Sequence, residues 1–487
     1  MMTLERLLEL VGREAGPAVR IDSRRVEAGD VFVAIRGTAC DGHDFIDQAL
    51  AHGAKYVVCQ ENHEVPAATA GPLQWERIVV KDSTQAAGAL AQAARGNPAA
   101  QLTNLAVTGT NGKTTVAFLV HACLRHAGET CGLIGTVVTD TGAGITASTL
   151  TTPDAITIAE AQQQMVQAGA RYMVVEASSH ALHQNRLAGI DFAAAAFTNL
   201  SGDHLDYHKT EEDYLAAKTR LFSALAPGAT AVLNQQAPQS QSIARATRAR
   251  IWWYAVDEPA DLTARIESMT VEGTRFTLAC EGQEAQVTTP LPGRYNVANH
   301  LAAAGLCLAA GFDLETVAAG LSSLQAIPGR LEKVGDGDLT VIVDYAHTDD
   351  ALEKVLATLA PLCRGRLTVV FGCGGDRDRT KRPRMGRAAE TWADAVVVTS
   401  DNPRTENPQA IINDIMAGFA QPDAVTVEPD RKKAIERAIR RAQPGDIVLI
   451  AGKGHETYQI IGDRTIDFSD KDIALQSLKE HPCSRPR

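Results

Sequence analysis

The sequence carries no excess of basic residues. Its 487 residues include 47 Lys and Arg against 58 Asp and Glu, which gives a net charge of −11. A chain that binds nucleic-acid backbones presents a basic face, so this balance argues against a nucleic-acid partner. Any anionic ligand must therefore be held by local donors and not by the overall field.

Disulfide frames and metal-binding cysteine pairs are missing as well. The nine cysteines are scattered without a C-x-x-C pair, which is typical of reduced cytosolic thiols and not of a disulfide scaffold or a zinc site. The first residues, "MMTLERLLELVGREAG", form an acidic amphipathic pattern that differs from a signal peptide. No apolar run approaches the length that spans a membrane. We expect a soluble, cytoplasmic protein without a membrane partner.

Two breaks divide the chain into three blocks. The length exceeds what one hydrophobic core supports and predicts two to four domains. The breaks are "GNP" at 96–98 and "PG" at 328–329, so we predict domains at 1–97, 98–327 and 328–487. The first block contains the short strand patterns "DVFVAIRG" and "KYVVC". In the third block strand and helix patterns alternate, which predicts a parallel sheet with flanking helices.

A glycine-rich stretch, "GTNGKTT", joins a strand pattern to a helix pattern. Backbone N–H groups and the helix dipole at such a junction favour a phosphate, where Lys113 would contact the outer phosphates and Thr114 would ligate Mg²⁺. Val107 replaces the first glycine of the usual motif, so a plain glycine-rich turn stays as the alternative. The helix pattern places on one face Val116, Leu119, Val120, Cys123 and Leu124. The predicted fold class is α/β, with a small mixed first domain, a central P-loop ATPase-type parallel-sheet domain and a C-terminal Rossmann-like domain.

Glu176 and Lys218 are candidates because of where the patterns place them. Glu176 ends the apolar strand pattern "RYMVVE", a position suited to Mg²⁺, although a strand-end glutamate alone is more often a solvated charge. In "EEDYLAAKTRLF", Lys218 follows Tyr214 by four residues and precedes Leu221 and Phe222 by three and four. It therefore shares their apolar face. A lysine that extends its ammonium to solvent is the simpler interpretation of this position.

The stretch "VVVTSDNPRTENP" places a polar turn at the end of an apolar strand pattern. The residue before a proline is disfavoured in the helical region, so Asn402-Pro403 predicts a turn. Parallel strands deliver ligand-binding groups at their carboxyl ends, and Arg404 has the geometry for a bidentate pair with a carboxylate. A surface turn with a solvated arginine is the alternative for the isolated tetrapeptide.

Ordered motifs over nearly the whole chain resemble the Mur ligase family, which includes the folylpolyglutamate synthases. They are "GTNGKTT", "EASSHALHQNRL", "FTNLSGDHLDYH", "YLAAKTRLF", "LPGRYNVANHLAA", "IPGRLE", "YAHT", "GCGGDRDRTKRP", "DNPRTENP" and "AGKGHE". The resemblance implies an ATP-dependent ligase of peptidoglycan synthesis, which converts a carboxylate into an acyl phosphate that an amine then attacks. "DNPR" is the family's diaminopimelate signature, and it implies transfer of meso-2,6-diaminopimelate to the D-glutamyl γ-carboxylate of UDP-N-acetylmuramoyl-L-alanyl-D-glutamate. These small molecules are the expected partners, and we expect a monomer.

The resemblance also implies a role for each matching residue. The catalytic residues would be Lys113, Glu176, His204 and Lys218. ATP would be bound by Thr110, Asn111, Gly112, Lys113, Thr114, Thr115, Asn296, Asn299, Arg330 and His347. The UDP-muramoyl-dipeptide would be bound by Ile21, Ser23, Thr38, Ala39, Cys40, Thr151, Thr152, Ser178, Gln184 and Arg186. Diaminopimelate would contact Arg377, Asp401, Asn402, Pro403, Arg404, Gly452 and Glu456. Two Mg²⁺ ions would be held by Thr114, Glu176, His204 and Lys218, the last as a carbamate formed with CO₂.

Two places depart from the family pattern. Asp349 stands in "YAHTDD" where relatives usually carry proline, and Gln235-Gln236 follow Asn234 where acidic residues are usual. Both departures put details of nucleotide contact in doubt. The nearest alternative is a lysine-adding ligase that differs only in the amino-acid pocket. The UDP-type first block and "DNPR" argue against a folate or cyanophycin-type ligase. A non-ligase P-loop protein, such as a motor or regulatory NTPase, would not need Lys218 on an apolar face or the third block.

Overall fold

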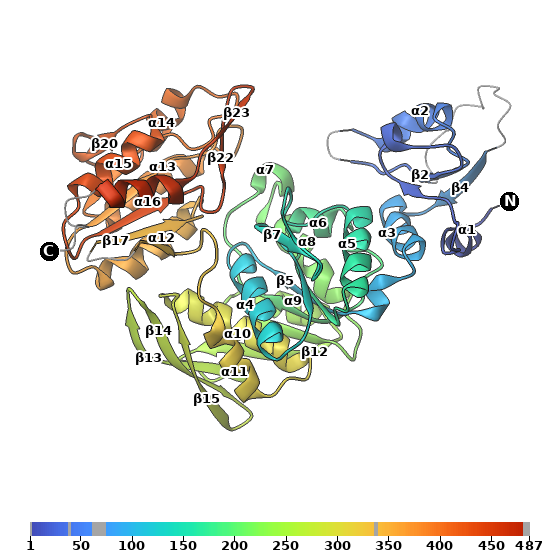
Figure 1. The fold of residues 1–487 in the computed structure, drawn as a ribbon, viewed down its shortest axis with the longest axis horizontal. Helices are drawn as coiled ribbons and strands as arrows, with labels where there is room; N and C mark the ends of the chain where they lie inside the picture. Colours follow the sequence, from blue (N-terminus) through green and yellow to red (C-terminus); the bar gives the residue numbers. More distant parts are fainter. Residues whose placement is uncertain (1, 38–39, 61–74, 336–338, 481–487) are drawn as a thin grey trace.

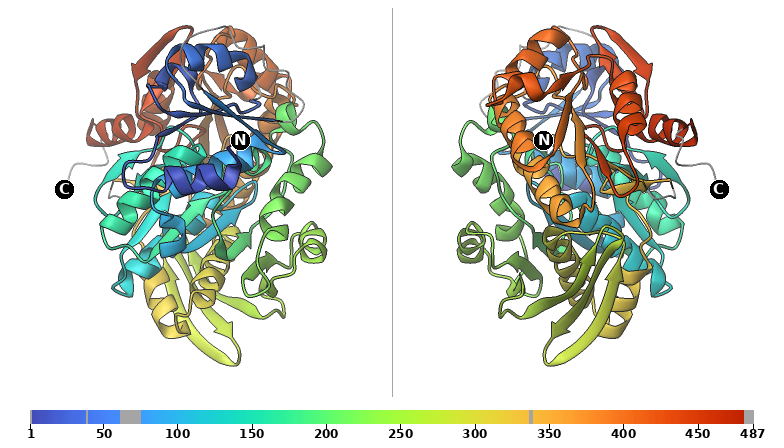
Figure 2. Two further views of the ribbon diagram at one scale, coloured as in Figure 1. Left: turned by 90° about the vertical axis from the view of Figure 1, so that its right-hand side faces the viewer. Right: turned by 90° about the vertical axis from the view of Figure 1, so that its left-hand side faces the viewer.

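The computed structural model describes residues 2–37, 40–60, 75–335 and 339–480. The N-terminal and C-terminal parts lie on opposite sides of a larger central part (Figure 1). Viewed from either side, both terminal parts lie at the top of the molecule, and one end of the central sheet lies at its bottom (Figure 2). Within the ranges given above, no helix is both long enough and apolar enough to cross a bilayer.

The N-terminal part is built on a parallel sheet with the order β1-β2-β3-β4. Its strands are β1 (Val19–Arg20), β2 (Val31–Val33), β3 (Tyr56–Gln60) and β4 (Glu76–Val80), and its helices are α1 (Leu4–Val11), α2 (Ile46–Ala51) and α3 (Ser83–Ala94). The two strand patterns predicted in this block correspond to β2 and β3. Helix α1 begins after Thr3, whose hydroxyl accepts the Arg6 N–H, and it buries Leu7 and Val11.

The central part contains a long mixed sheet with the order β15-β14-β13-β12-β11-β10-β5-β9-β6-β7-β8. Its strands are β5 (Thr103–Thr108), β6 (Cys131–Ile134), β7 (Val138–Asp140), β8 (Ile145–Ala147), β9 (Tyr172–Glu176), β10 (Phe192–Phe197), β11 (Thr230–Asn234), β12 (Arg250–Val256), β13 (Leu262–Thr270), β14 (Gly273–Cys280) and β15 (Gln283–Thr289). Its helices are α4 (Lys113–His126), α5 (Ala155–Gln167), α6 (Ser179–His183), α7 (Leu205–His208), α8 (Glu211–Ser223), α9 (Ser240–Ala246), α10 (Arg294–Ala309) and α11 (Leu314–Ser323).

The strands in the middle of this sheet are parallel, as predicted, but both edges are antiparallel. At one edge β13, β14 and β15 pair antiparallel, and at the other β6, β7 and β8 do so. The connection between β13 and β14 is only two residues, 271–272. A connection this short can join only antiparallel neighbours, whereas a parallel pair needs a longer crossover.

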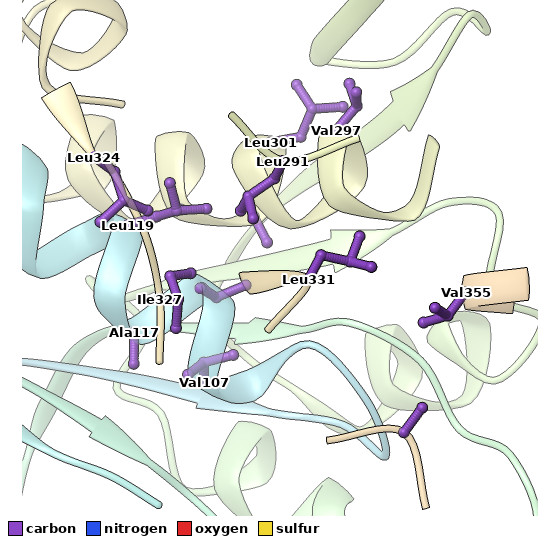
Figure 3. Packing of buried hydrophobic residues seen from close by; sticks show 14 of the residues in the cluster. Val107, Ala117, Leu119, Leu291, Val297, Leu301, Leu324, Ile327, Leu331 and Val355 are labelled. Atoms are coloured by element: carbon purple, nitrogen blue, oxygen red, sulfur yellow. The ribbon is translucent and has the colours of Figure 1, made fainter. Parts of the chain in front are cut away.

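One hydrophobic cluster joins the central sheet to the C-terminal part. Helix α4 buries the predicted face, including Val116 and Leu119, against α10 and α11. Figure 3 shows Val107 of β5 beneath this layer, and the same cluster continues through Ile327 and Leu331. It reaches Val355 in helix α12 (Asp349–Leu359). The "PG" break at 328–329 therefore lies between segments that pack in one cluster, although Pro328 itself is exposed.

The C-terminal part has a sheet with the order β16-β17-β21-β18-β19-β20, parallel except for β16. Its strands are β16 (Glu332–Val334), β17 (Thr340–Asp344), β18 (Leu367–Phe371), β19 (Ala395–Val398), β20 (Thr426–Val427) and β21 (Ile447–Ala451), with a separate hairpin of β22 (Tyr458–Ile461) and β23 (Arg464–Asp467). Besides α12, its helices are α13 (Lys381–Trp392), α14 (Pro408–Met416), α15 (Arg431–Arg441) and α16 (Asp470–Glu480). The loops after β17, β18, β19 and β21 lie at one edge of this sheet, because parallel strands end on the same side.

Candidate active site

The phosphate-loop motif lies between β5 and α4, as its pattern predicts. Gly112 has φ 89° and immediately precedes α4. A Cβ atom at this position would lie 2.3 Å from Asn299 Oδ1, so both the backbone and the close approach require glycine. Lys113 Nζ donates to the Gly109 and Thr110 carbonyl oxygens, each at 2.8 Å. Burial lowers the pKa of Lys113 from its ordinary value.

A cavity of about 780 Å³ opens beside this loop, between the central and C-terminal parts. The predicted ATP-binding residues all line it, namely Thr110, Asn111, Gly112, Lys113, Thr114, Thr115, Asn296, Asn299, Arg330 and His347. Thr151, Glu176 and His204 line it as well. Burial lowers the pKa of His347 to about 4, so this imidazole is neutral near pH 7. The structure thus brings these separate motifs to one hollow of ligand size.

Glu176 is fully buried at the end of β9 and is surrounded by donors. Its Oε1 accepts the Thr136 N–H at 2.8 Å, and its Oε2 accepts the hydroxyls of Thr136 and Thr114, each at 2.9 Å. Arg330 Nη2 donates to the same Thr114 hydroxyl at 3.0 Å. The carboxylate is therefore fixed beside the phosphate loop, and the alternative of a solvated glutamate is wrong.

His204 immediately precedes α7, and Lys218 belongs to α8. His204 has φ 56° and precedes the short helix α7; burial lowers its pKa, which leaves a neutral imidazole near pH 7. Lys218 is 1% exposed, and its Nζ lies 4.3 Å from the centre of the Tyr214 ring. Burial, with a smaller contribution from the charge of Lys113, lowers the pKa of Lys218 well below its ordinary value. The ammonium does not reach solvent, so the alternative of a solvent-directed lysine is wrong.

The donors around the phosphate loop suit Mg²⁺ by their chemistry. Hard cations prefer carboxylate and hydroxyl oxygens, and Glu176 and Thr114 place such oxygens in contact. His204 adds a neutral nitrogen. Among the residues that the structure describes, no three His, Cys, Asp or Glu side chains form a ready metal centre. Glu176 and Thr114 are therefore the described pair whose oxygens fit a Mg²⁺ ion at this loop.

Four of the residues predicted to bind the UDP-muramoyl-dipeptide form one hydrogen-bonded group. Arg186 Nη1 donates to the Thr152 carbonyl at 2.8 Å, and Arg186 Nε and Nη2 donate to Gln184 Oε1 at 3.0 and 2.8 Å. Thr152 Oγ1 donates to Glu176 O at 2.6 Å and lies 3.1 Å from Ser178 Oγ. This group therefore adjoins the strand end that carries Glu176.

Three other described residues of that predicted set lie in the N-terminal part, away from this group. Ile21 and Ser23 belong to the N-terminal part, where Ser23 Oγ donates to Gln48 Oε1 at 2.8 Å, and Cys40 is exposed. Thr38 and Ala39 lie outside the described residues. Thr151 Oγ1 is 3.1 Å from Thr136 Oγ1. Within the described residues, the set is thus divided between the N-terminal part and the central part, where Thr151 adjoins Thr152.

The "DNPR" loop follows β19 and lies beside the "AGKGHE" loop after β21. Asn402 Nδ2 donates to Glu456 Oε2 at 2.8 Å, and a Cβ at Gly452 would lie 2.7 Å from Asp401 Oδ2. The fully buried Lys453 donates to Asn402 Oδ1 at 3.1 Å and to Glu456 Oε2 at 2.9 Å. These contacts bring together the predicted residues of the two loops.

Arg404 is half-buried in the left-handed region, with φ 50°. Its Nη1 donates to the Gly375 carbonyl at 2.7 Å, and its backbone pairs with the hairpin through Ile460 O and Gly462 N. Among the described residues no other hydrogen bond of its guanidinium is found. Arg377 is exposed, and its Nη1 donates to Asp376 O at 3.1 Å. The backbone and one guanidinium nitrogen of Arg404 are thus held by hydrogen bonds, and its other N–H groups have no partner among the described residues. This differs from the solvated surface turn given as the alternative.

Family models match the chain in three consecutive segments. "Mur ligase family, catalytic domain" matches residues 18–95, "Mur ligase middle domain" 107–307, and "Mur ligase, glutamate ligase domain" 329–454. A relative from Geobacillus thermodenitrificans, named UDP-N-acetylmuramoyl-L-alanyl-D-glutamate–2,6-diaminopimelate ligase, is 45% identical over 95% of each chain. The chain belongs to the Mur ligase family. The expected family and its three-part α/β class are confirmed.

Further comparisons agree with this membership. A Mur ligase of the same name from Gloeobacter violaceus is 47% identical over 94% of this chain and 93% of its own. A solved structure with that name is 35% identical, has a TM-score of 0.68, and covers 95% of this chain and 94% of its own. MurF from Acinetobacter baumannii shares the fold at 20% identity, with a TM-score of 0.64 over 92% and 95% of the two chains. Membership in the Mur ligase family makes this protein a ligase and argues against the non-ligase P-loop alternative.

The two departures from the usual Mur ligase pattern have local partners. Asp349 pairs with Arg384, whose Nε lies 2.7 Å from Asp349 Oδ2. Gln236 lines the cavity, accepts the Val256 N–H at 3.1 Å and donates to Glu258. Gln235 donates to the Pro259 carbonyl at 3.0 Å. Both glutamines therefore fasten the loop after β11 to the loop after β12.

Some residues of this Mur ligase site were not predicted from the sequence. Thr136 donates twice to Glu176, Lys453 joins the two loops of the C-terminal part, and Tyr345 packs 4.4 Å from the Arg330 guanidinium. Asp350 accepts from Asn111 Nδ2 at 2.9 Å and thus connects α12 to the phosphate loop. Thr136 and Tyr345 each lie just beyond a strand end, and that position was the available signal.

Proposed function

We propose that this Mur ligase adds meso-2,6-diaminopimelate to the D-glutamyl γ-carboxylate of UDP-N-acetylmuramoyl-L-alanyl-D-glutamate, with conversion of ATP to ADP and phosphate, in peptidoglycan synthesis. The observation that carries the proposal is the "DNPR" loop, held beside Glu456 in a chain 45–47% identical to ligases with this activity in their names. The cavity beside the phosphate loop supports the ATP part of the proposal.

The first step would be phosphorylation of the substrate carboxylate. A free carboxylate is a poor electrophile, and the acyl phosphate supplies a leaving group; the amine of diaminopimelate then attacks the acyl carbon and phosphate departs. Lys113 would contact the outer phosphates, while Glu176 and Thr114 stay aligned by their mutual hydrogen bond. When bound by Thr114, Glu176, His204 and carbamylated Lys218, two Mg²⁺ ions would neutralise phosphate charge.

Lys218 is proposed to act as a carbamate. Its lowered pKa favours the neutral amine, whose nitrogen can form a bond to the carbon of CO₂ and release a proton. The product is an anionic, carboxylate-like group in place of a cation. Such an anionic group would lie near the cation of Lys113 and offer oxygen to Mg²⁺.

Arg404 is proposed to select the amino acid. The distal end of meso-diaminopimelate carries a carboxylate beside the amine, whereas lysine carries only an ammonium. The unused donors of Arg404 suit that carboxylate as a bidentate pair, and they would repel lysine. Asn402 or Glu456 would take the distal amine, and Arg377, Asp401, Pro403 and Gly452 would complete the pocket.

The remaining roles follow the order of the chain. Residues 1–97 would hold the UDP moiety through Ile21, Ser23 and 38–40, residues 98–327 would hold ATP and the dipeptide, and residues 328–487 would hold the amino acid. The dipeptide contacts would be Thr151, Thr152, Ser178, Gln184 and Arg186. We place the reaction in the cytoplasm and propose a monomer.

A ligation assay tests the proposal. Purified protein is incubated with ATP, Mg²⁺ and the UDP-dipeptide, with either meso-diaminopimelate or L-lysine, and both ADP release and the UDP-tripeptide are measured. We expect ADP release to depend on the dipeptide and diaminopimelate together. Equal use of lysine would overturn the assigned amino acid, and ADP release without any UDP-tripeptide would overturn the ligase reaction.

A further inference from the structure

Gln184 has only one orientation that satisfies Arg186. A guanidinium donates hydrogen bonds and accepts none, so the two N–H groups of Arg186 at 3.0 and 2.8 Å require the oxygen of the Gln184 amide. The amide nitrogen, Nε2, must then point the other way. There it donates to the hydroxyl of Tyr207 at 3.0 Å.

Tyr207 in turn has a place for its own proton. Its oxygen accepts from Gln184, and its hydroxyl can donate to His183 Nδ1, 2.9 Å away, in the tautomer that leaves this ring nitrogen unprotonated. The Tyr207 ring packs against His180, with ring centres 4.2 Å apart. The packed ring of Tyr207 thus holds its hydroxyl where it accepts from the Gln184 amide nitrogen.

These hydrogen bonds hold the Arg186 guanidinium in place and leave some of its N–H groups available to an anion. Arg186 has five N–H groups, and the described residues take three of them, through Gln184 Oε1 and the Thr152 carbonyl. One N–H on each terminal nitrogen is left, which suits one carboxylate. If Gln184 turned, Arg186 would lose two hydrogen bonds and its fixed direction.

We propose that Tyr207 is a positioning residue for the UDP-dipeptide substrate, acting through Gln184 on Arg186 and its contact with a substrate carboxylate. This inference rests on the proposed function, and no motif interpretation assigned Tyr207 a role. Tyr207 lies in α7, three residues after His204, at the top of the central part beside α6 and α8 (Figure 1). The same short turn therefore supports the dipeptide contacts at one end and carries a proposed metal ligand at the other.

Tyr207→Phe tests the proposal, because it removes the hydroxyl and keeps the ring against His180. We expect KM for the UDP-dipeptide to rise about five- to tenfold, the size of one hydrogen bond, with KM for ATP and diaminopimelate and the unfolding temperature unchanged. The control is Tyr172→Phe, the same change at the first residue of β9, at the far end of that strand from Glu176. It should leave every KM unchanged.

A double-mutant cycle separates positioning from a general structural role. In a Gln184→Ala background the hydroxyl has no amide to hold, so adding Tyr207→Phe should leave KM for the UDP-dipeptide where Gln184→Ala put it. An unchanged KM in Tyr207→Phe, an equal rise in all three KM values, or full additivity in the cycle would overturn the inference while the wild type still ligates. Absence of ligation by the wild type would overturn the proposed function, and this inference with it.

Discussion

Lys218 and Lys453 are both buried, but their surroundings differ. Lys453 donates to Glu456 and Asn402, so a carboxylate and an amide oxygen are its partners within the buried site. Lys218 faces the ring of Tyr214 near another cation, Lys113, and its pKa is lowered well below the ordinary value. A lysine with a carboxylate partner is a fixed structural cation. One without a partner is driven toward the neutral amine, which is the chemically reactive form.

The largest expected effect comes from Lys218→Ala. If this lysine is the reactive one, ligation should fall about a thousandfold, and added bicarbonate should not restore it. The thermal unfolding temperature should fall modestly, because the buried side chain leaves a cavity, and the activity is compared at a temperature where both proteins are folded. Lys432→Ala, on the exposed surface of α15, is the control and should keep full activity. Full activity of Lys218→Ala would show that the two lysines do not differ in the proposed way.

Lys453→Met should act mainly on stability. It leaves the carboxylate of Glu456 and the amide oxygen of Asn402 without their cation, and removal of one partner from a buried pair costs about 3 kcal/mol. Urea unfolding measures this loss, and KM for diaminopimelate should rise while KM for ATP does not. If Lys453→Met were as stable as the wild type, Lys453 would not be the matched cation described above.

Arg404→Lys tests whether the "DNPR" loop, which Lys453 holds through Asn402, binds the distal carboxylate of diaminopimelate. An ammonium cannot form the bidentate pair, so we expect KM for diaminopimelate to rise roughly tenfold, the effect of one charged hydrogen bond. The preference for diaminopimelate over lysine should fall by a similar factor. Competition between the two amino acids in one assay measures this preference directly. An unaltered preference would contradict the role of Arg404.

His300 extends the comparison to an unpaired histidine in the core. Its Nδ1 contacts Asn296 O, but Nε2 has no partner among the described residues, and burial lowers its pKa to about 4. Below about pH 6.5 His300 binds a proton in the unfolded chain but stays neutral in the folded protein. The free energy of unfolding therefore decreases as pH falls from about 6.5 toward 4. Relative to His300→Leu, the wild type should lose up to about 1.4 kcal/mol per pH unit in that window. Parallel urea curves at pH 7 and 5 that show no such difference would contradict this.

Much of this site could be predicted because its residues follow strand ends. The phosphate loop after β5, Glu176 at the end of β9 and the "DNPR" loop after β19 all lie where their patterns place them. The spacing of Lys218 from Tyr214 and Phe222 predicted their shared apolar face, but a solvent-directed ammonium was the simpler interpretation of that spacing, and the structure buries the side chain. What could not be predicted depends on contacts between distant segments. The pairing of Lys453 with Asn402 joins residues 51 positions apart, and the bond from Asn111 to Asp350 joins residues 239 apart.

The antiparallel edges of the central sheet were missed for a different reason. The prediction for residues 98–327 was a parallel sheet, and it named no strand within 262–289. Strand order at an edge depends on connection length, and the two-residue link between β13 and β14 allows only an antiparallel pair. Likewise, the sequence places Gln184 and Tyr207 on separate turns, and nothing in either stretch indicates which end of the amide faces Arg186.

The hydrophobic cluster that runs from Val107 through Ile327 and Leu331 to Val355 has a consequence for how this protein can be divided. A sequence boundary at 327/328 cuts through side chains that pack on both sides of it. A fragment ending there would lose the apolar neighbours of α4 and α10 and would expose a hydrophobic patch that favours aggregation. For expression, crystallisation or exchange of parts between relatives, residues 98–487 are best kept together, because the central and C-terminal parts share this cluster.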